Sequence, residues 1–194
     1  TNPEDVTLWG EEKDAGPYTN ETRGHTGPRP VLLPGEDNRI LLFWRGPGYD
    51  TWLRTSADGW NWDAPEPFMA AGESSPYFQV AGDGDASVHI AVSPAHPRAE
   101  GGDRILYARY YDNAAWRADG TRIRGTYELP FTMDECDVVY DGSADGVSAW
   151  VWDVADDEGI PVIVYVTFPS LDDHRYWYAR WTPGGWERHE MTAA

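Results

Sequence analysis

The sequence is poor in cysteine and in lysine, with Cys136 and Lys13 as the single examples among 194 residues. One cysteine cannot form a disulfide within the chain, and it leaves the redox compartment open. The 15 basic residues face 33 acidic ones, for a net charge of −18. Such a balance argues against a nucleic-acid partner, because nothing would neutralise phosphates in bulk. No apolar run approaches the ~18 residues of a membrane-spanning helix, so we expect no membrane partner either.

Metal-binding and cofactor-binding patterns are also missing. The sequence has no His-x-x-x-His, no paired cysteines, no EF-hand spacing and no glycine-rich phosphate loop. We therefore expect neither a metal nor a cofactor. No signal-peptide pattern is present, and Thr1 resembles a trimmed start. The acidic composition suits a soluble extracellular or periplasmic protein.

Helical periodicity is almost absent, while short runs of β-branched and aromatic residues are frequent. These runs alternate with turn clusters such as Gly46-Pro47-Gly48 and Gly82-Asp83-Gly84. Many short strands at regular spacing predict an all-β sandwich, barrel or propeller. The expected strands are Arg39–Arg45, Thr51–Thr55, Tyr77–Val80, Ser87–Val92, Arg104–Tyr111, Ser148–Val154, Pro161–Thr167 and Arg175–Trp181.

An aromatic-x-Arg pattern recurs three times, and this repetition favours the propeller among these folds. Its copies are Trp52-Leu53-Arg54, Tyr107-Ala108-Arg109 and Tyr178-Ala179-Arg180, each preceded by an apolar strand and followed by tryptophan. A unit of about 45–50 residues with about four strands is the period of a propeller blade. The third unit has one extra strand, Ser148–Val154. We expect a single partial β-propeller domain over 1–194, of three to four four-stranded antiparallel blades, with the three repeated aromatics packed between blades.

The turn Ser56-Ala57-Asp58-Gly59-Trp60-Asn61-Trp62 resembles the Asp box of sialidase-type, BNR-repeat propellers, where it closes a hairpin between outer strands. Together with SPYFQV, AWVWDVADDEGIPVIVYV and DDHRYWYARW, it resembles a BNR-repeat family of carbohydrate-active propellers. That family includes proteins similar to ulvan lyases, rhamnose–glucuronate lyases and rhamnosidases. The resemblance runs over nearly the whole chain from about Gly24.

The resemblance implies a longer protein than this chain. Such propellers close with about seven blades, so the chain resembles an N-terminal half. We expect self-association or a second chain that completes the propeller. Thr7–Trp9, an isolated apolar strand, would then be the one that normally closes the ring.

Three candidate catalytic residues follow from the resemblance and from position. His25 lies in a His-x-x-Pro context before the first inner strand, where the family carries a catalytic histidine; the alternative is a loop residue that caps the first blade. Tyr77 corresponds to a proton-donating tyrosine, or it packs in the core. His96 flanks Pro97 on a rigid loop, where binding residues are frequent.

Four further residues are candidate substrate ligands. Arg45 stands where ulvan-lyase-like sequences continue to a second histidine, and it could bind a carboxylate. Arg98 shares the loop of His96. His174 and Arg175 have no counterpart in the other repeats, and function in repeat proteins is often added at such positions; a salt bridge with the acidic turn or with a buried Asp153 is the alternative. His89, in mid-strand, is expected to be a satisfied core histidine, and His189 is expected to be exposed.

The leading hypothesis is an enzyme that acts on an acidic polysaccharide by β-elimination. This reaction needs a cation for the uronate carboxylate, a base and an acid. Arg45 or Arg98 could supply the first, His25 the second, and Tyr77 or His96 the third. A chain of charge −18 needs a locally positive site to accept such a substrate. The alternatives are a glycoside hydrolase, which ordinarily needs two carboxylates, and a non-catalytic sugar-binding propeller that relies on its aromatics.

Overall fold

The computed structural model describes residues 27–125 and 128–194, and these residues form strands and short 3-10 turns. His25 and Thr7–Trp9 lie outside the described residues. The strands form three sheets, so the prediction of an all-β chain is confirmed. No helix in the described part of the chain is long and apolar enough to cross a membrane.

The first sheet has the order β1-β2-β3-β4-β10 and the second has the order β5-β6-β7-β8-β9, with β11 added against β7. The third sheet, β12-β13-β14-β15, is the four-stranded antiparallel unit that the repeat predicts. β10 pairs with β4 in parallel, which the repeat does not predict. The strand bounds are β1 Arg29–Leu33, β2 Arg39–Arg45, β3 Thr51–Ser56, β4 Glu66–Ala70, β5 Tyr77–Gly82, β6 Val88–Ser93, β7 Arg104–Tyr111, β8 Ala114–Trp116, β9 Arg122–Gly125, β10 Phe131–Thr132, β11 Asp137–Asp141, β12 Ser148–Asp157, β13 Ile160–Ser170, β14 Asp173–Thr182 and β15 Gly185–Ala193.

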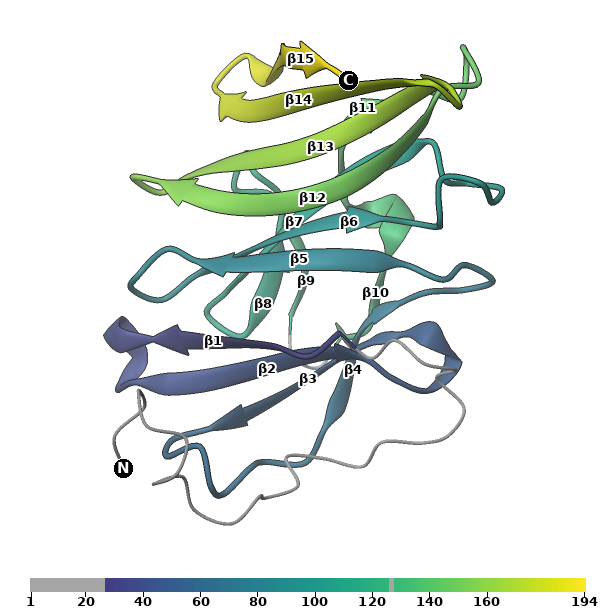
Figure 1. The fold of residues 1–194 in the computed structure, drawn as a ribbon. Helices are drawn as coiled ribbons and strands as arrows, with labels where there is room; N and C mark the ends of the chain where they lie inside the picture. Colours follow the sequence, from purple (N-terminus) through teal and green to yellow (C-terminus); the bar gives the residue numbers. More distant parts are fainter. Residues whose placement is uncertain (1–26, 126–127) are drawn as a thin grey trace, which may run out of the picture.

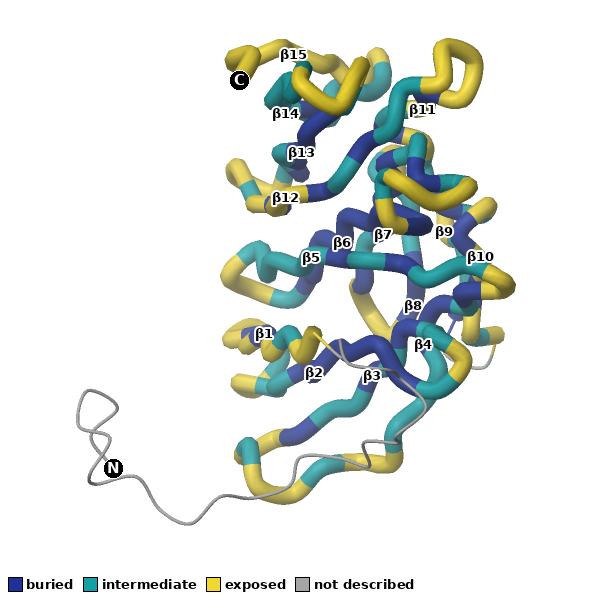
Figure 2. Tube along the Cα trace, turned by 45° about the vertical axis from the view of Figure 1, so that its right-hand side comes forward, coloured by how far each residue is buried: buried dark blue, intermediate teal, exposed yellow. Residues whose placement is uncertain are grey.

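The first strands of the three sheets lie side by side, with β5 between β1 and β12 (Figures 1 and 2). β12 is therefore the first strand of the third sheet, equivalent to β1 and β5. The prediction that Ser148–Val154 is an extra strand of the third unit is wrong. The cause is β1, which the sequence analysis does not identify: this edge strand is short and contains Pro30, which cannot donate to a ladder.

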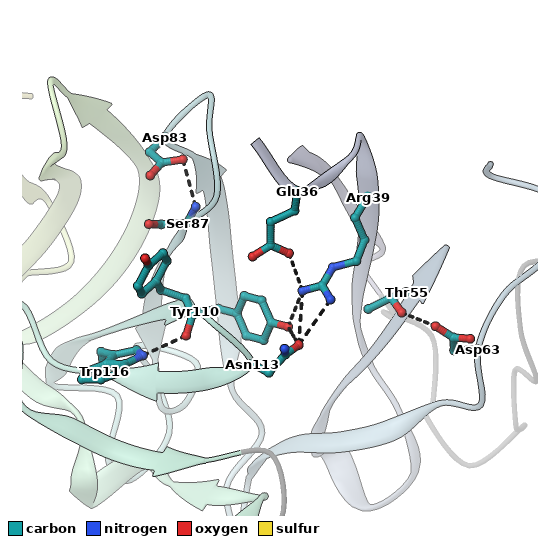
Figure 3. A network of polar contacts seen from close by, with 10 residues as sticks. Glu36, Arg39, Thr55, Asp63, Asp83, Ser87, Tyr110, Asn113 and Trp116 are labelled. Carbon is teal, nitrogen blue, oxygen red and sulfur yellow. Dashed lines mark hydrogen bonds and ion pairs between the residues drawn. The ribbon is translucent and has the colours of Figure 1, made fainter. Parts of the chain in front are cut away.

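The cores lie between successive sheets (Figure 2). Tyr110 of the second sheet meets Phe43 and Phe68 of the first sheet edge-to-face, at ring-centroid distances of 6.4 and 6.0 Å. At the margin of this core Arg39 forms an ion pair with Glu36 and donates a hydrogen bond of 2.9 Å to the Tyr110 hydroxyl (Figure 3). The first two sheets are thus joined by apolar packing and by a charged hydrogen-bond network.

The second interface is built around a buried histidine. The Tyr107 hydroxyl lies 2.7 Å from His89 Nδ1, and His89 Nε2 lies 2.8 Å from an Asp156 carboxylate oxygen on β12. The carboxylate only accepts, so the neutral ring donates from Nε2 and accepts the tyrosine proton at Nδ1. The interpretation of His89 as a satisfied core histidine is confirmed. Burial lowers the pKa of His89 and raises that of Tyr107.

The repeated aromatics do not all occupy equivalent positions. Tyr107 is fully buried and its ring meets Trp186 of the third sheet edge-to-face at 5.1 Å, as expected for packing between sheets. Trp52 is out of phase: its neighbour Leu53 lies in the core with the second sheet, whereas Trp52 stacks on Trp44 at 6.4 Å. Because strand side chains alternate between faces, Trp52 points away from the second sheet, and its prediction as an aromatic between sheets is wrong.

The Asp box has the structural role that its pattern predicts. Ser56 donates a hydrogen bond of 2.6 Å to the Asn61 carbonyl, and the Asp58 carboxylate accepts from the amides of Trp60 and Asn61 at 2.8 and 2.7 Å. These backbone hydrogen bonds lower the pKa of Asp58 to about 2. A bridge between Ser56 and Trp62 closes the turn. The Asp box therefore orders the connection between β3 and β4.

Candidate functional site

One end of all three sheets carries the candidate site. In an antiparallel pair the start of one strand faces the end of the next. Accordingly Arg29 pairs with Phe43, Tyr77 with Ser93, and Ser148 with Phe168. The starts of β1, β5 and β12 and the ends of β2, β6 and β13 therefore meet along one edge of the molecule.

Two adjoining cavities open at this edge, and they share His96 and Trp150. The first has a volume of about 590 Å³ and the second about 520 Å³, within the size range of ligand sites. We name them the histidine half and the arginine half of one groove. The histidine half is lined by His96, Pro97, Arg98, Ser148, Trp150, Phe168, Ser170, Leu171 and His174. The arginine half is lined by Gly27, Arg29, Arg45, Pro76, Tyr77, Phe78, Gln79, His96 and Trp150.

The groove collects most of the predicted site residues although they are far apart in the sequence. Tyr77, His96, Arg45, Arg98 and His174 all line it. The sequence pattern does not identify Arg29, Trp150 or Phe168 as site residues. Arg29 and Trp150 lie near the starts of β1 and β12, as Tyr77 lies at the start of β5, so their position indicates this role once β1 and β12 are recognised as first strands. Phe168 lies opposite the start of β12, near the end of β13.

Arg175 does not line either cavity. Its guanidinium forms ion pairs with Asp173 at 3.0 Å and with Glu190 at 3.7 Å, and it lowers the pKa of Asp173 through their hydrogen bonds. The alternative of a salt bridge with the acidic turn is thus confirmed for Arg175. Asp153 is exposed, so its prediction as a buried partner is wrong. His189 is exposed, as expected.

Arg45 is the most unusual residue of the groove. Its side chain ends a strand and is 5% exposed, yet its hydrogen-bond acceptors are both neutral. The terminal nitrogen donates to the Ser75 hydroxyl at 3.1 Å and to the Pro76 carbonyl at 3.3 Å, and Nε is buried without a hydrogen-bond partner. The guanidinium lies 5.0 Å from the Tyr77 ring centroid and 5.4 Å from that of Tyr49. Burying a cation without a carboxylate partner costs folding free energy. An anionic ligand at Arg45 would offset this cost.

The charge of the groove is opposite to that of the whole chain. Three arginines and two histidines line it, and no aspartate or glutamate is found among the described lining residues. Buried Nε atoms without a hydrogen-bond partner occur on Arg29 as well as on Arg45. The groove thus provides the locally positive site that an acidic ligand requires.

The two groove histidines share one neutral tautomer, with the proton on Nε2, but they leave different ring nitrogens free. His96 Nδ1 accepts the backbone N–H of Arg98 at 3.1 Å, so the neutral ring carries its proton on Nε2. His174 Nε2 lies 3.2 Å from the Leu171 carbonyl, which only accepts, so the neutral ring has its free lone pair on Nδ1. One histidine is therefore arranged to donate a proton and the other to accept one.

Gly102 sets the position of the loop that carries His96. A Cβ at this glycine would lie 2.2 Å from the His96 carbonyl oxygen, which no side chain tolerates. The Gly102 carbonyl also accepts the N–H of Ala149 at 2.9 Å, and the Ser93 hydroxyl accepts the N–H of Val151 at 2.7 Å. These contacts bind the loop to β12 and bring the His96 ring to 4.9 Å from Trp150.

The model of the family described as BNR repeat-containing family member matches residues 1–194. The chain belongs to the BNR repeat-containing family. A comparison with curated proteins gives no match. Family membership agrees with the Asp box and with the aromatic-x-Arg motif that recurs on β3, β7 and β14, the third strand of each sheet. Members of this BNR-repeat family are often carbohydrate-active.

No group of three or more histidine, cysteine, aspartate or glutamate side chains that could hold a metal ion occurs among residues 27–125 and 128–194. The described residues that line the groove of this BNR-repeat protein offer the chemistry of arginine, histidine, tyrosine and aromatic rings.

Proposed function

We propose that this protein is a carbohydrate-active enzyme that cleaves a uronate-containing polysaccharide by β-elimination, and that its three sheets are consecutive blades of a partial β-propeller. The propeller is supported by the side-by-side first strands and by the equivalent third strands, β7 and β14. The activity is supported above all by the buried, carboxylate-free Arg45 in an acid-free groove.

Elimination begins with the proton on the carbon α to the uronate carboxylate. A guanidinium on the carboxylate stabilises the negative charge that develops when a base removes this proton. The electron pair then forms the C4=C5 double bond, and the C4–O bond breaks with protonation of the departing oxygen. Arg45, with Arg29 beside it in the lining, supplies the cation, and His96 supplies the proton from Nε2.

His25 remains a candidate base from its sequence context, and Tyr77 and His174 are the candidates within the described groove. We expect His25→Ala to abolish turnover while thermal unfolding stays nearly unchanged, because a base contributes to the reaction and little to packing. Loss of stability together with full activity per folded molecule would contradict this role.

The test is incubation with uronate-containing polysaccharides while ultraviolet absorbance of the unsaturated uronate is recorded. We expect absorbance to rise with the wild-type protein and Arg45→Gln to abolish the rise. Arg175→Gln is the matched control: it removes the same charge outside the cavities, and its rate should equal that of the wild type. An unchanged rate in Arg45→Gln would overturn the proposal.

The same assay separates the alternatives. A glycoside hydrolase of the rhamnosidase or sialidase type would release reducing ends without new absorbance. The usual hydrolase needs two carboxylates about 5–10 Å apart, which the described lining does not provide, although Tyr77 leaves open a tyrosine nucleophile of the sialidase kind. A sugar-binding propeller would retain the polysaccharide without cleaving it.

A further inference from the structure

Trp150 occupies the junction between the two halves of the groove. It lines both cavities, as His96 does. Its ring lies 4.7 Å from that of Tyr77 and 4.9 Å from that of His96, with the histidine approaching edge-on. The side chain is half-buried, so part of the indole faces the groove.

The two halves differ in the ligand that each can hold. Within the described groove lining, the buried arginine Nε atoms that lack a hydrogen-bond partner belong to Arg29 and Arg45, and both residues line the arginine half. The histidine half has Phe168 and Leu171 in its wall, and its one arginine, Arg98, is exposed. A carboxylate is therefore favoured in the arginine half, whereas the histidine half suits a sugar without a buried charge.

An acid that protonates a departing oxygen must lie within hydrogen-bond reach of the bond that breaks. His96 is the proton donor of the groove and lies at the junction, so the bond must lie there too. We propose that Trp150 is the platform on which the sugars stack at the bond that is cleaved, with the uronate in the arginine half and the departing sugar in the histidine half. This inference rests on the proposed function and adds the direction in which the polysaccharide lies in the groove.

The direction of the bound polysaccharide follows from the chemistry. Elimination expels the sugar attached through O4 of the uronate, which is the neighbour on the non-reducing side. The non-reducing end therefore extends past Phe168 and Leu171 toward the β13–β14 turn, and the reducing end extends past Arg45 toward β1. Trp150 acts by stacking, so it affects binding of both sugars, whereas Arg45 affects binding of the uronate.

The test compares Trp150→Ala, Trp150→Phe and Trp152→Ala. Trp152 is on the same strand, is 65% exposed and lines neither cavity, which makes it the matched control. The probes are a uronate-containing oligosaccharide, followed by its absorbance, and the same oligosaccharide with its carboxyl groups reduced to alcohols, which cannot eliminate and is followed by calorimetry. Thermal unfolding of each variant verifies the fold.

We expect Trp150→Ala to weaken binding of the reduced oligosaccharide, and to raise KM for the acidic one, by about tenfold. Trp150→Phe should restore most of the binding of the reduced oligosaccharide and most of the KM for the acidic one. Trp152→Ala should have the binding and the KM of the wild type. Arg45→Gln, which should form no product, should bind the acidic probe more weakly in calorimetry and bind the reduced one as the wild type does.

Three results would overturn the inference. One is equal binding by Trp150→Ala and Trp152→Ala. Another is a fall in kcat for Trp150→Ala with binding unchanged, which would mean that Trp150 only supports Tyr77 and His96. The third is failure of the wild type to bind either probe. If the wild type binds but never forms the unsaturated product, the proposed lyase fails, and the reduced probe still decides the role of Trp150.

Discussion

Arg45 combines two properties that are rarely found together, near-complete burial and neutral hydrogen-bond partners. Part of the cost of burial is offset by the rings of Tyr49 and Tyr77, since a guanidinium within about 6 Å of a ring centroid is attracted to its face. The remainder is a cost in stability that only a ligand would remove. Such a trade of stability for function is common at binding sites.

We therefore predict that Arg45→Met raises or preserves the free energy of unfolding, by as much as about 2 kcal/mol, because it removes a buried charge and keeps a similar volume. The same variant should lose binding of the acidic oligosaccharide. Urea denaturation and calorimetry on one preparation measure both. A loss of more than about 2 kcal/mol would show that Ser75 and Pro76 satisfy the cation fully.

At the scale of single residues the sequence predicts a good part of the groove. Tyr77 is identifiable from the family resemblance, His96 from its place on a loop made rigid by Pro97, and His174 because it has no counterpart in the other repeats. Arg175 also has no counterpart in the other repeats, and of the two roles that the sequence leaves open for it the structure shows the salt bridge with the acidic turn, to Asp173. The sequence does not indicate a site role for Trp150, because its spacing from Trp152 is the ordinary alternation of residues in a strand.

Among the elements, β7 and β14 carry the same tyrosine with different surroundings. Tyr107 has the third sheet against it, whereas Tyr178 is half-buried and stacks on the exposed His189 at 4.9 Å. The sequence assigns both to the core because the motif is identical. Burial depends on what the next sheet covers, and the motif carries no information about that.

We predict that Tyr107→Ala costs roughly 3–5 kcal/mol of unfolding free energy, as large-to-small core changes do. Tyr178→Ala should cost clearly less, since its ring is partly in solvent already. Chemical denaturation of the two variants beside the wild type provides the comparison. Equal losses would mean that something covers the third sheet in solution.

The His89 network makes the second interface sensitive to pH. Burial, the largest influence, lowers the His89 pKa below its usual 6.5, so the unfolded chain takes up a proton more readily than the folded one. Its contribution is thus fully present above pH 6.5 and is lost as pH falls from there through the lower pKa of the folded state. Asp156 and Tyr107 contact the ring directly, and Arg109 and Asp83 act on its charge.

We predict that wild-type stability falls more steeply below neutral pH than that of His89→Gln, which cannot take up a proton. His189→Gln is the matched control, because His189 is exposed on β15 and lies outside the interface between the second and third sheets. Urea unfolding at a series of pH values from mildly acidic to neutral gives the slopes. Parallel slopes for the wild type and His89→Gln would show that this histidine does not titrate on unfolding.

On the scale of the whole molecule, the third sheet has one covered and one open face. Ile163, Tyr165 and Ala179 pack against the second sheet. On the other face Val162, Val164, Tyr176 and Tyr178 are half-buried. The sequence predicts such a face from the repeat count, but it does not predict which residues form it, because the register follows from pairing.

We predict that this face mediates association, either of two copies or with a second chain, since contiguous apolar surface of this kind marks interaction sites. Light scattering over a range of concentrations should show a mass that rises for the wild type. Tyr176→Lys, which places a charge on the open face, should suppress the rise. A monomer at every accessible concentration would contradict association of two copies and leave a second chain as the partner of this face.

The groove takes Arg45 from the first sheet, Tyr77 and His96 from the second, and Trp150 and His174 from the third. No sheet holds the proposed proton donor, the proposed stacking platform and the buried cation together, so a single repeat unit that is duplicated would not carry the proposed reaction by itself. Each unit can change its own contribution while the other two stay intact. Substrate preference can therefore diversify one unit at a time, through exchanges at strand ends that leave the cores between the sheets untouched.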